Sequence, residues 1–190
     1  RKYGIKRFKV GHAGTLDPLA SGVLLLCTGK ATKRIEELQS HTKEYVAEIM
    51  LGATTPSFDM EHPVDATYPY EHITREMVEE ALQQFVGDIA QRPPLFSACK
   101  VEGKRAYDLA RKGKEVERKS RTITIHTLEL LEFDGMFARL RVRCSKGIYI
   151  RTLCKDIGEA LGCGGCMAEL RRISAGEYTQ EEAVPLAQLI

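Results

Sequence analysis

The residue types best suited to chemistry are concentrated in residues 9–24, where several glycines accompany His12, Asp17 and Pro18 ahead of an apolar run. Glycine adopts backbone conformations that other residues avoid, and the proline restricts Asp17 to an extended backbone. The pattern predicts a stiff active-site loop that presents a carboxylate. Asp followed by Pro is equally typical of an ordinary helix start, so the local pattern leaves both interpretations open.

Two further residues could act together with Asp17. Arg151 stands at the start of a predicted helix, where the positive end of the helix dipole disfavours a cation, so an acidic partner is expected. If that partner is Asp17, the arginine lowers the pKa of the carboxyl and keeps it ionised. A solvated arginine is the alternative. Tyr45 lies on the apolar side of a predicted strand and is by default a core aromatic with its hydroxyl at the edge.

Metal chemistry has little support in the sequence. Cys163 and Cys166 have the spacing of half a zinc site, but no second cysteine pair or spaced histidine pair completes it, which favours a packed, glycine-rich turn. His12 has no second histidine at ligand spacing and is expected to make a loop contact instead. The six cysteines are spread too widely for a disulfide scaffold, which indicates reduced thiols. No metal is expected.

The distribution of charge points to a polyanionic partner. The net charge is +2, but residues 44–91 contain ten acidic residues and one basic residue, so the remainder carries +11. The basic residues cluster in residues 1–10, 100–121 and 139–155. A positive surface of this kind is typical of proteins that bind nucleic acid.

The composition describes a soluble globular chain whose 190 residues are enough for a sizeable core. No apolar run approaches the roughly 20 residues of a membrane span. The basic N-terminus has no apolar region behind it, so a signal peptide is not predicted. We expect a cytoplasmic monomer without membrane contact.

The elements that must position these residues are predicted from the spacing of apolar side chains. Residues 22–28 form a continuous apolar run, which predicts a buried strand, and a helix is predicted over residues 30–38. The alternation in residues 44–51 predicts a half-buried strand. Residues 52–70 lack a period and predict an exposed loop. With the helix capped by Thr74, they make residues 52–91 an acidic loop-and-helix insertion.

The second half of the chain adds a predicted basic helix over residues 104–112 and a long hairpin. The hairpin strands, residues 115–134 and 136–145, turn at an Asp-Gly pair that is a strong hairpin signal. One face of the second strand is apolar, and the other is cationic through Arg139, Arg141 and Arg143. A helix then begins near Ile150 and a strand covers residues 167–173. These elements predict an α+β fold with a mixed, mainly antiparallel sheet flanked by helices.

The motifs in the chain resemble those of the TruB family of tRNA pseudouridine synthases. Residues 11–24 resemble the family's catalytic motif, and later stretches follow in family order. These stretches are residues 43–45, 93–103, 105–113, 146–151 and 170–172. The resemblance implies that a T-loop uridine of tRNA is isomerised to pseudouridine without a metal or an organic cofactor.

The resemblance also implies roles for individual residues. Asp17 would be the essential catalytic aspartate, Tyr45 would stack on the target uracil and assist proton removal, and Arg151 would pair with Asp17. The residues expected to contact substrate RNA are His12, Leu170, Tyr149, Lys100 and Tyr107. Among these, His12 would contact the refolded RNA loop and Leu170 would line the pocket beside the ring, whereas packing explains Tyr149 and Tyr107 equally well.

This chemistry requires a pocket. The enzyme must break the C–N glycosidic bond, turn the uracil and rejoin it through C5, so the nucleotide must be flipped out of the RNA. Asp17 could attack the substrate covalently or stabilise charge at the sugar carbon, and the sequence does not separate these routes.

Two departures from the family pattern concern the ends of the chain. A Lys-Pro and Thr-Ser stretch is expected upstream, and a small RNA-binding domain is expected downstream. We therefore expect residues 1–190 to be a catalytic domain trimmed at both ends. Two alternative functions remain: a non-catalytic protein that binds or folds tRNA, and a guide-RNA-dependent synthase that acts on ribosomal RNA.

Overall fold

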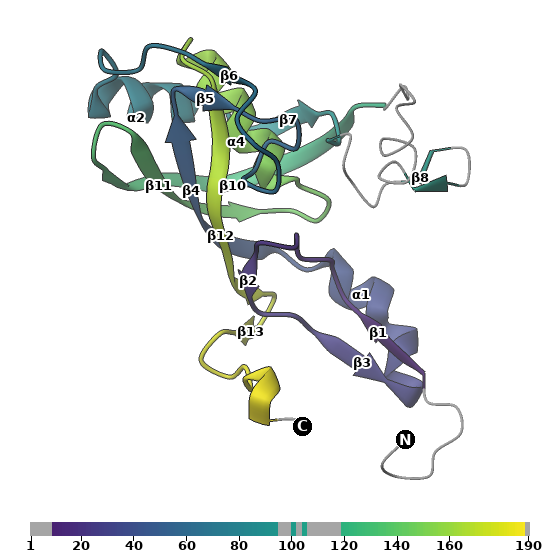
Figure 1. Cartoon of the computed structure of the whole chain (residues 1–190). Coiled ribbons are helices and arrows are strands. Elements are labelled where there is room, and N and C mark those ends of the chain that lie inside the picture. The colour runs from purple at the N-terminus through teal and green to yellow at the C-terminus, as the bar shows by residue number, and fades with distance from the viewer. Residues whose placement is uncertain (1–8, 95–99, 102–103, 106–118, 189–190) are drawn as a thin grey trace.

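A computed structural model describes residues 9–94, 100–101, 104–105 and 119–188 of the chain. Its centre is a seven-stranded sheet with the order β13-β12-β4-β11-β10-β7, in which β2 pairs with β12 (Figure 1). All pairings are antiparallel except that of β2 with β12. The strands are β2 (Ser21–Gly22), β4 (Lys43–Leu51), β7 (Gly87–Gln91), β10 (Arg121–Phe133), β11 (Phe137–Cys144), β12 (Gly165–Ala175) and β13 (Tyr178–Thr179).

Two helices cover one face of this sheet. α4 (Ile150–Ala160) packs on β12 and β4, whereas α2 (Arg75–Gln83) packs on β10. Inward-facing residues of β4 alternate strictly with half-exposed ones, which places Tyr45 and its apolar neighbours in the core under α4. The sheet therefore buries one face, as expected for an antiparallel sheet in an α+β protein, and the predicted fold class is confirmed.

A smaller unit lies at one end of the sheet (Figure 1). It consists of the hairpin of β1 (Val10–His12) with β3 (Leu26–Thr28), followed by the 3₁₀-helix η1 (Gly29–Arg34) and α1 (Ile35–Ser40). Its own small core contains Ala13, Cys27 and Leu38. The remaining short elements are β5 (Ala53–Thr54), β6 (Ala66–Thr67), β8 (Lys100–Val101), β9 (Lys104–Arg105) and η2 (Leu186–Gln188).

Several predicted elements are confirmed. The strand over residues 44–51 is β4, the helix that follows Thr74 is α2, and the Asp-Gly hairpin joins β10 to β11. The Thr74 hydroxyl accepts a hydrogen bond of 3.4 Å from the Met77 amide, as a helix N-cap should. Alternation identified β4, the Thr74 cap and the apolar stripe identified α2, and the Asp-Gly turn identified the hairpin.

The prediction of one buried strand over residues 22–28 is wrong. Only Ser21–Gly22 and Leu26–Thr28 are strands, and the side chains of Leu24 and Leu26 are 41% and 54% exposed. The chain leaves the main sheet here to join the hairpin: the Val23 amide donates to the Arg172 carbonyl at 2.9 Å, while Leu25 accepts from Ala13. An apolar run that crosses between two sheets cannot be buried along its whole length.

The helices predicted over residues 30–38 and 104–112 also differ from the structure. Residues 29–34 are a 3₁₀-helix, and α-helix begins only at Ile35. Lys104 and Arg105 were predicted to start a basic helix. They form strand β9 instead, which pairs with β8 in an antiparallel ladder. Residues 106–112 of that predicted helix lie outside the described part of the chain. Among the described residues, no helix is long and apolar enough to cross a membrane.

Candidate functional site

Asp17 lies on the loop between β1 and β2, in a tight turn. Its carbonyl accepts a 2.9 Å hydrogen bond from the Ala20 amide, and Pro18 occupies the second position of this turn, where its fixed φ is favourable. The helix-start interpretation of Asp17-Pro18 is therefore wrong. The turn leaves the Asp17 side chain 24% exposed at the wall of a pocket.

Arg151 holds the Asp17 carboxylate in a two-point contact. Its Nη2 donates to Oδ1 at 2.9 Å, and its Nε lies 2.9 Å from Oδ2. This fork geometry fixes the orientation of the carboxylate plane as well as its position. Arg151 lies in the first turn of α4 and is itself only 3% exposed.

The pKa of Asp17 results from two opposing effects. Burial of the carboxyl raises its pKa, and the charge and hydrogen bonds of Arg151 oppose that shift. The carboxylates of Asp59 and Glu61 add a smaller upward contribution. The net direction is upward, opposite to the lowering expected from Arg151 alone, because desolvation is the larger effect.

Asp59 is a member of this cluster that the sequence interpretation missed. Its Oδ2 lies 3.3 Å from Nη1 of Arg151, which also donates to the Ser57 carbonyl at 3.2 Å. Asp59 is 1% exposed, although it belongs to the segment predicted as an exposed loop. Backbone contacts of this segment with Met167 of β12 hold it in place. Two carboxylates thus share one buried arginine near the positive end of the α4 dipole.

Tyr45 approaches the same pocket from β4. The residue is 8% exposed, and burial raises the pKa of its hydroxyl to about 12, with a further upward effect from Cys144, while Arg172 opposes the shift through its charge and a hydrogen bond. Arg172 is the cross-strand partner of Tyr45 on β12. The phenol is therefore protonated at neutral pH.

The pocket that these residues share has a volume of about 820 Å³. Its wall includes all three candidate catalytic residues, and Leu170 and Tyr149 line it as well. Gln91, which is 2% exposed, fixes one side by bonding the backbone amide and carbonyl of Tyr149 at 2.8 and 3.1 Å. A cavity of this size accommodates a nucleoside.

Of the other candidate residues, the structure describes the side chain of His12 alone. His12 is exposed on β1 and does not line the pocket. The backbone of Lys100 belongs to β8, and its side chain is outside what the structure describes. Tyr107 likewise lies outside the described residues.

Cations that the sequence interpretation did not single out lie at the pocket. Arg121 and Lys146 are exposed residues of the pocket wall. Lys43, also in the wall, is 5% exposed, and its Nζ donates to the carbonyls of Gln39 and His41 at 2.5 and 2.6 Å, so it caps the end of α1. Burial lowers the pKa of Lys43. The mouth of the pocket is therefore electropositive.

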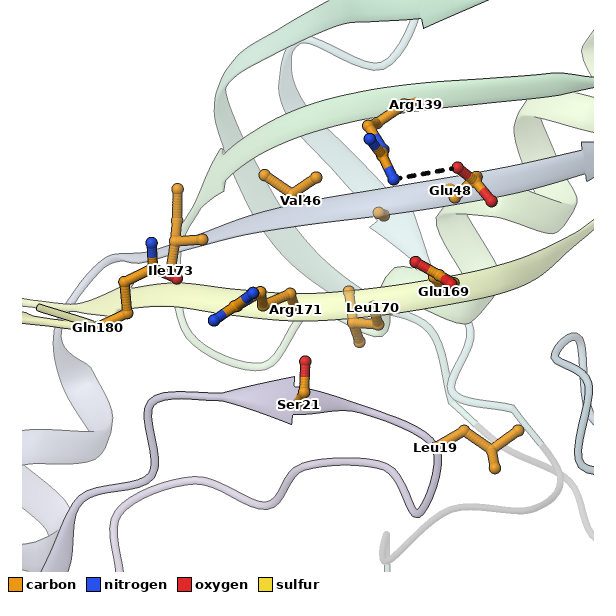
Figure 2. Close-up of a pocket in the computed structure, with 11 residues that line it drawn as sticks. Leu19, Ser21, Val46, Glu48, Arg139, Glu169, Leu170, Arg171, Ile173 and Gln180 are labelled. Carbon is orange, nitrogen blue, oxygen red and sulfur yellow. Dashed lines mark ion pairs between the residues drawn. The ribbon is translucent and has the colours of Figure 1, made fainter. Parts of the chain in front are cut away.

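The predicted cationic face of β11 is largely neutralised. Arg139 lies 3.5 Å from Glu48 and 3.4 Å from Glu132, and Arg141 lies 3.5 Å from Glu44. The register of β11 against β4 puts the glutamates of β4 beside these arginines. Figure 2 shows this face, where a second pocket of about 500 Å³ lies between β12 and the loop of Leu19 and carries both signs of charge.

Cysteines and possible metal ligands are dispersed. No group of three or more His, Cys, Asp or Glu side chains in the described ranges is placed to hold a metal ion. The described cysteines are buried and free, and the thiol of Cys163 contacts the Gly164 carbonyl in a turn.

Comparisons with known proteins bear on this arrangement. A family model described as "TruB family pseudouridylate synthase (N terminal domain)" matches residues 1–150, and one described as "tRNA pseudouridylate synthase B C-terminal domain" matches residues 151–190. The boundary between the two matches falls within the first turn of α4, whose residues pack in the same core as β4.

Curated relatives match along nearly the whole chain. A protein named tRNA pseudouridine synthase B from Phocaeicola vulgatus is 63% identical over 184 residues, which cover 97% of this chain and 78% of that protein. The protein of the same name from Bacteroides fragilis is 61% identical over 188 residues, covering 99% and 81%. The one from Clostridium kluyveri is 45% identical over 188 residues, covering 99% and 65%.

Solved structures share the fold. A crystal structure of a Cbf5-Nop10-Gar1 complex contains a chain that matches with a TM-score of 0.72 and 34% identity, covering 95% of this chain and 45% of that one. A chain from an H/ACA RNP bound to a substrate RNA containing 2'-deoxyuridine matches with a TM-score of 0.68 and 30% identity, covering 95% and 43%. This chain thus spans less than half the length of either solved chain.

Proposed function

The chain belongs to the TruB family of pseudouridylate synthases, and we infer that it isomerises a uridine of tRNA to pseudouridine. The observation that carries this inference is the Asp17 carboxylate, held by Arg151 at the wall of a pocket of about 820 Å³. A carboxylate repels phosphate, so its place at the wall of this pocket favours a role in the reaction over a role in RNA binding alone.

The target uridine is a T-loop nucleotide that leaves the RNA stack to enter this pocket. Loop bases can be splayed out and stacked on aromatic side chains, whereas bases in a helix are inaccessible. Arg121 and Lys146, at the mouth of the pocket, are placed to contact the phosphates that flank the flipped nucleotide.

Asp17 is the catalytic residue, acting at the sugar of the flipped uridine. When the glycosidic bond breaks, the uracil leaves with the bonding electron pair on N1, and positive charge develops at C1′. An ionised carboxylate can form a bond to the sugar or stabilise this charge, and both routes need the orientation that Arg151 imposes. The uracil then turns, C5 bonds to C1′, and the proton on C5 is lost.

Tyr45 supplies an aromatic surface to the uracil. With a pKa of about 12, its hydroxyl is neutral at physiological pH, so the enzyme without substrate offers a ring and a hydrogen-bonding phenol. Leu170 borders the same pocket. The ring above the base and the apolar side chain beside it keep the detached uracil in the pocket while it rotates.

Residues 1–190 act as one catalytic domain in this proposal. Asp17 comes from an N-terminal loop, Asp59 from the acidic segment 52–91 and Arg151 from α4, and they meet in a single cluster. The acidic segment is therefore part of the site rather than an appendage. Because Asp17, Tyr45 and Arg151 all come from one chain, we propose that the enzyme acts as a monomer. We also propose that it works in the cytoplasm, where tRNA is found, and that the carboxylate chemistry needs no metal.

The experiment is a tritium-release assay on a T-loop transcript labelled at C5 of uridine, with the protein alone. We expect release of one tritium per transcript, and no release from a matched transcript in which cytidine replaces the target uridine. Release that appears only when a guide RNA is added would contradict the proposal and favour a guide-dependent enzyme. Binding of the transcript without release would favour an RNA-folding protein.

A further inference from the structure

Arg172 is a buried cation whose side chain is directed at the loop that carries Asp17. It is the largest of the fully buried side chains, at 1% exposure, and it lies on β12. Its Nε donates to the Val23 carbonyl at 2.7 Å, its Nη2 to the Gly14 carbonyl at 3.2 Å, and its Nη1 to the Thr15 carbonyl at 3.5 Å. These acceptors flank Asp17 on both sides in the sequence.

The environment of Arg172 differs from that of Arg151. Within the described ranges, no carboxylate lies within ion-pair distance of Arg172, and backbone carbonyls of the loop take the place of a counterion. A buried guanidinium is costly unless its donors are satisfied. The loop and Arg172 therefore depend on each other: without the loop the cation loses its acceptors.

The backbone of Arg172 docks the other end of the loop. Gly22 is its parallel partner in β2, and the Val23 amide donates to the Arg172 carbonyl at 2.9 Å. Gly22 has a φ of +102°, and a Cβ added there would lie 2.1 Å from the Arg172 carbonyl oxygen. Only glycine allows the two backbones to approach this closely.

Arg172 also reaches Tyr45. The two residues are cross-strand partners on β12 and β4, and both line the pocket. Arg172 thus lies between the loop that carries Asp17, to which it is bonded, and the aromatic residue on the neighbouring strand.

We propose that Arg172 is a positioning residue, which fixes the Asp17 loop on β12 and sets the distance between the Asp17 carboxylate and the ring of Tyr45. The proposal rests on the function inferred above. It assigns Arg172 no contact with the reacting atoms. Arg151 orients the carboxylate, whereas Arg172 holds the backbone from which that carboxylate projects.

The first test replaces Arg172 by lysine and by methionine, with Arg171→Met, at its exposed neighbour, as the matched control. Lysine keeps the charge but can reach only some of the acceptors. A misplacement of about 1 Å is expected to lower the single-turnover rate at saturating tRNA about 100-fold in Arg172→Met and less in Arg172→Lys. The dissociation constant for tRNA should stay within about threefold. Arg171→Met should leave both quantities unchanged.

The second test does not depend on activity. Hydrogen exchange followed by mass spectrometry should show at least about tenfold faster exchange in the peptide that covers residues 13–23 of Arg172→Lys, with protection of β4 and α4 retained. If the wild-type protein makes no pseudouridine, the proposed function is refuted. The hydrogen-exchange result would still show whether Arg172 anchors the Asp17 loop. Loss of protection throughout the chain would assign Arg172 to the global fold and overturn the proposal.

A third variant tests the docking of the loop on the Arg172 backbone without changing the Arg172 side chain. Gly22→Ala inserts a Cβ against the Arg172 carbonyl, whereas Gly135→Ala has the same φ of +102° but meets nothing within 4 Å. We expect loop exchange and rate to change in Gly22→Ala and not in Gly135→Ala. Equal effects in both variants, or an unchanged loop in Arg172→Lys, would overturn the proposal.

Discussion

Arg151 and Asp17, which are 134 positions apart in the sequence, meet through two nitrogen–oxygen contacts of 2.9 Å each. The arginine is buried, and Asp59 contacts its Nη1, the nitrogen that the Asp17 contact does not use. Together with the Ser57 carbonyl, Asp59 helps to hold the guanidinium that orients Asp17. We therefore expect the geometry of Asp17 to depend on Asp59, although Asp59 does not line the pocket.

Replacing Asp59 by asparagine should therefore lower both stability and rate. The variant loses one charge-assisted contact of a buried arginine, which corresponds to about 2 kcal/mol in the free energy of unfolding. Urea unfolding measures this loss, and the tritium-release assay should show a slower reaction at saturating tRNA. The control is Asp65→Asn in the same segment, where the exposed carboxylate accepts from Thr54 and the cost should stay below about 0.5 kcal/mol. Equal losses in both variants would contradict a special role for Asp59.

The rate should depend on pH through Asp17. Burial raises the pKa of this carboxyl above its ordinary value of 3.8, and the reaction needs the ionised form, so the rate should fall as the pH falls through the raised pKa. In Arg151→Lys the carboxylate loses its two-point partner, so the acid limb of the profile should move to still higher pH. An acid limb that is identical in the two proteins would contradict the assignment.

The raised pKa of Asp17 also determines how the stability of the folded protein depends on pH. A carboxyl whose pKa is higher in the folded state binds its proton more tightly there. Its contribution to stability is fully present below the ordinary pKa and is lost as the pH rises through the raised one. This is opposite to the behaviour of a salt-bridged carboxylate whose pKa is lowered, and it means that the ionised Asp17 required for activity makes the folded state less stable.

Substitution of Tyr45 should separate the ring from the hydroxyl. Tyr45→Phe keeps the stacking surface and loses the hydroxyl, so it cannot form the hydrogen bond that the phenol can offer, and a rate lower by about tenfold is expected. Tyr45→Leu also loses the ring, and base–aromatic stacking is worth about 1–3 kcal/mol, so its rate should fall by a further factor of about 10 to 100. Single-turnover kinetics on one transcript measures both. A phenylalanine variant as slow as the leucine variant would show that the hydroxyl, not the ring, is essential.

The salt dependence of tRNA binding should identify the RNA-facing side. Lys146 is exposed at the pocket, whereas Arg141 on the opposite face is paired with Glu44. Lys146→Gln should weaken tRNA binding and reduce the slope of log K against log salt by about 1. Arg141→Gln serves as the matched control and should leave the slope unchanged. The reverse result would place the RNA on the face shown in Figure 2.

Local sequence patterns were sufficient to predict the parts of the fold that show a long periodic run or a strong turn or cap signal. Residues that are adjacent in the sequence determine the alternation of β4, the capped helix α2 and the Asp-Gly hairpin. The pairing of Asp17 with Arg151 was accessible too, because an arginine at a helix N-terminus needs an acid. Family resemblance, rather than spacing, suggested which acid.

Burial that depends on distant partners could not be predicted in the same way. Asp59 lies in a polar segment without a period, and its burial depends on distant residues: Arg151, 92 positions later, and Met167 of β12. The arginines of β11 form an exposed basic stripe in the sequence. Their neutralisation depends on the strand register, which sets Glu48 opposite Arg139.

The central claim, that the Asp17 carboxylate performs the reaction, is tested most directly by Asp17→Asn in the tritium-release assay with saturating tRNA. Asparagine keeps the size of the side chain and can still accept from Arg151, so the fold and the affinity for tRNA should change little. We predict no detectable tritium release over the time in which the wild-type protein completes many turnovers. Release at even a few per cent of the wild-type rate, with tRNA binding intact, would contradict the assignment of Asp17 as the catalytic residue.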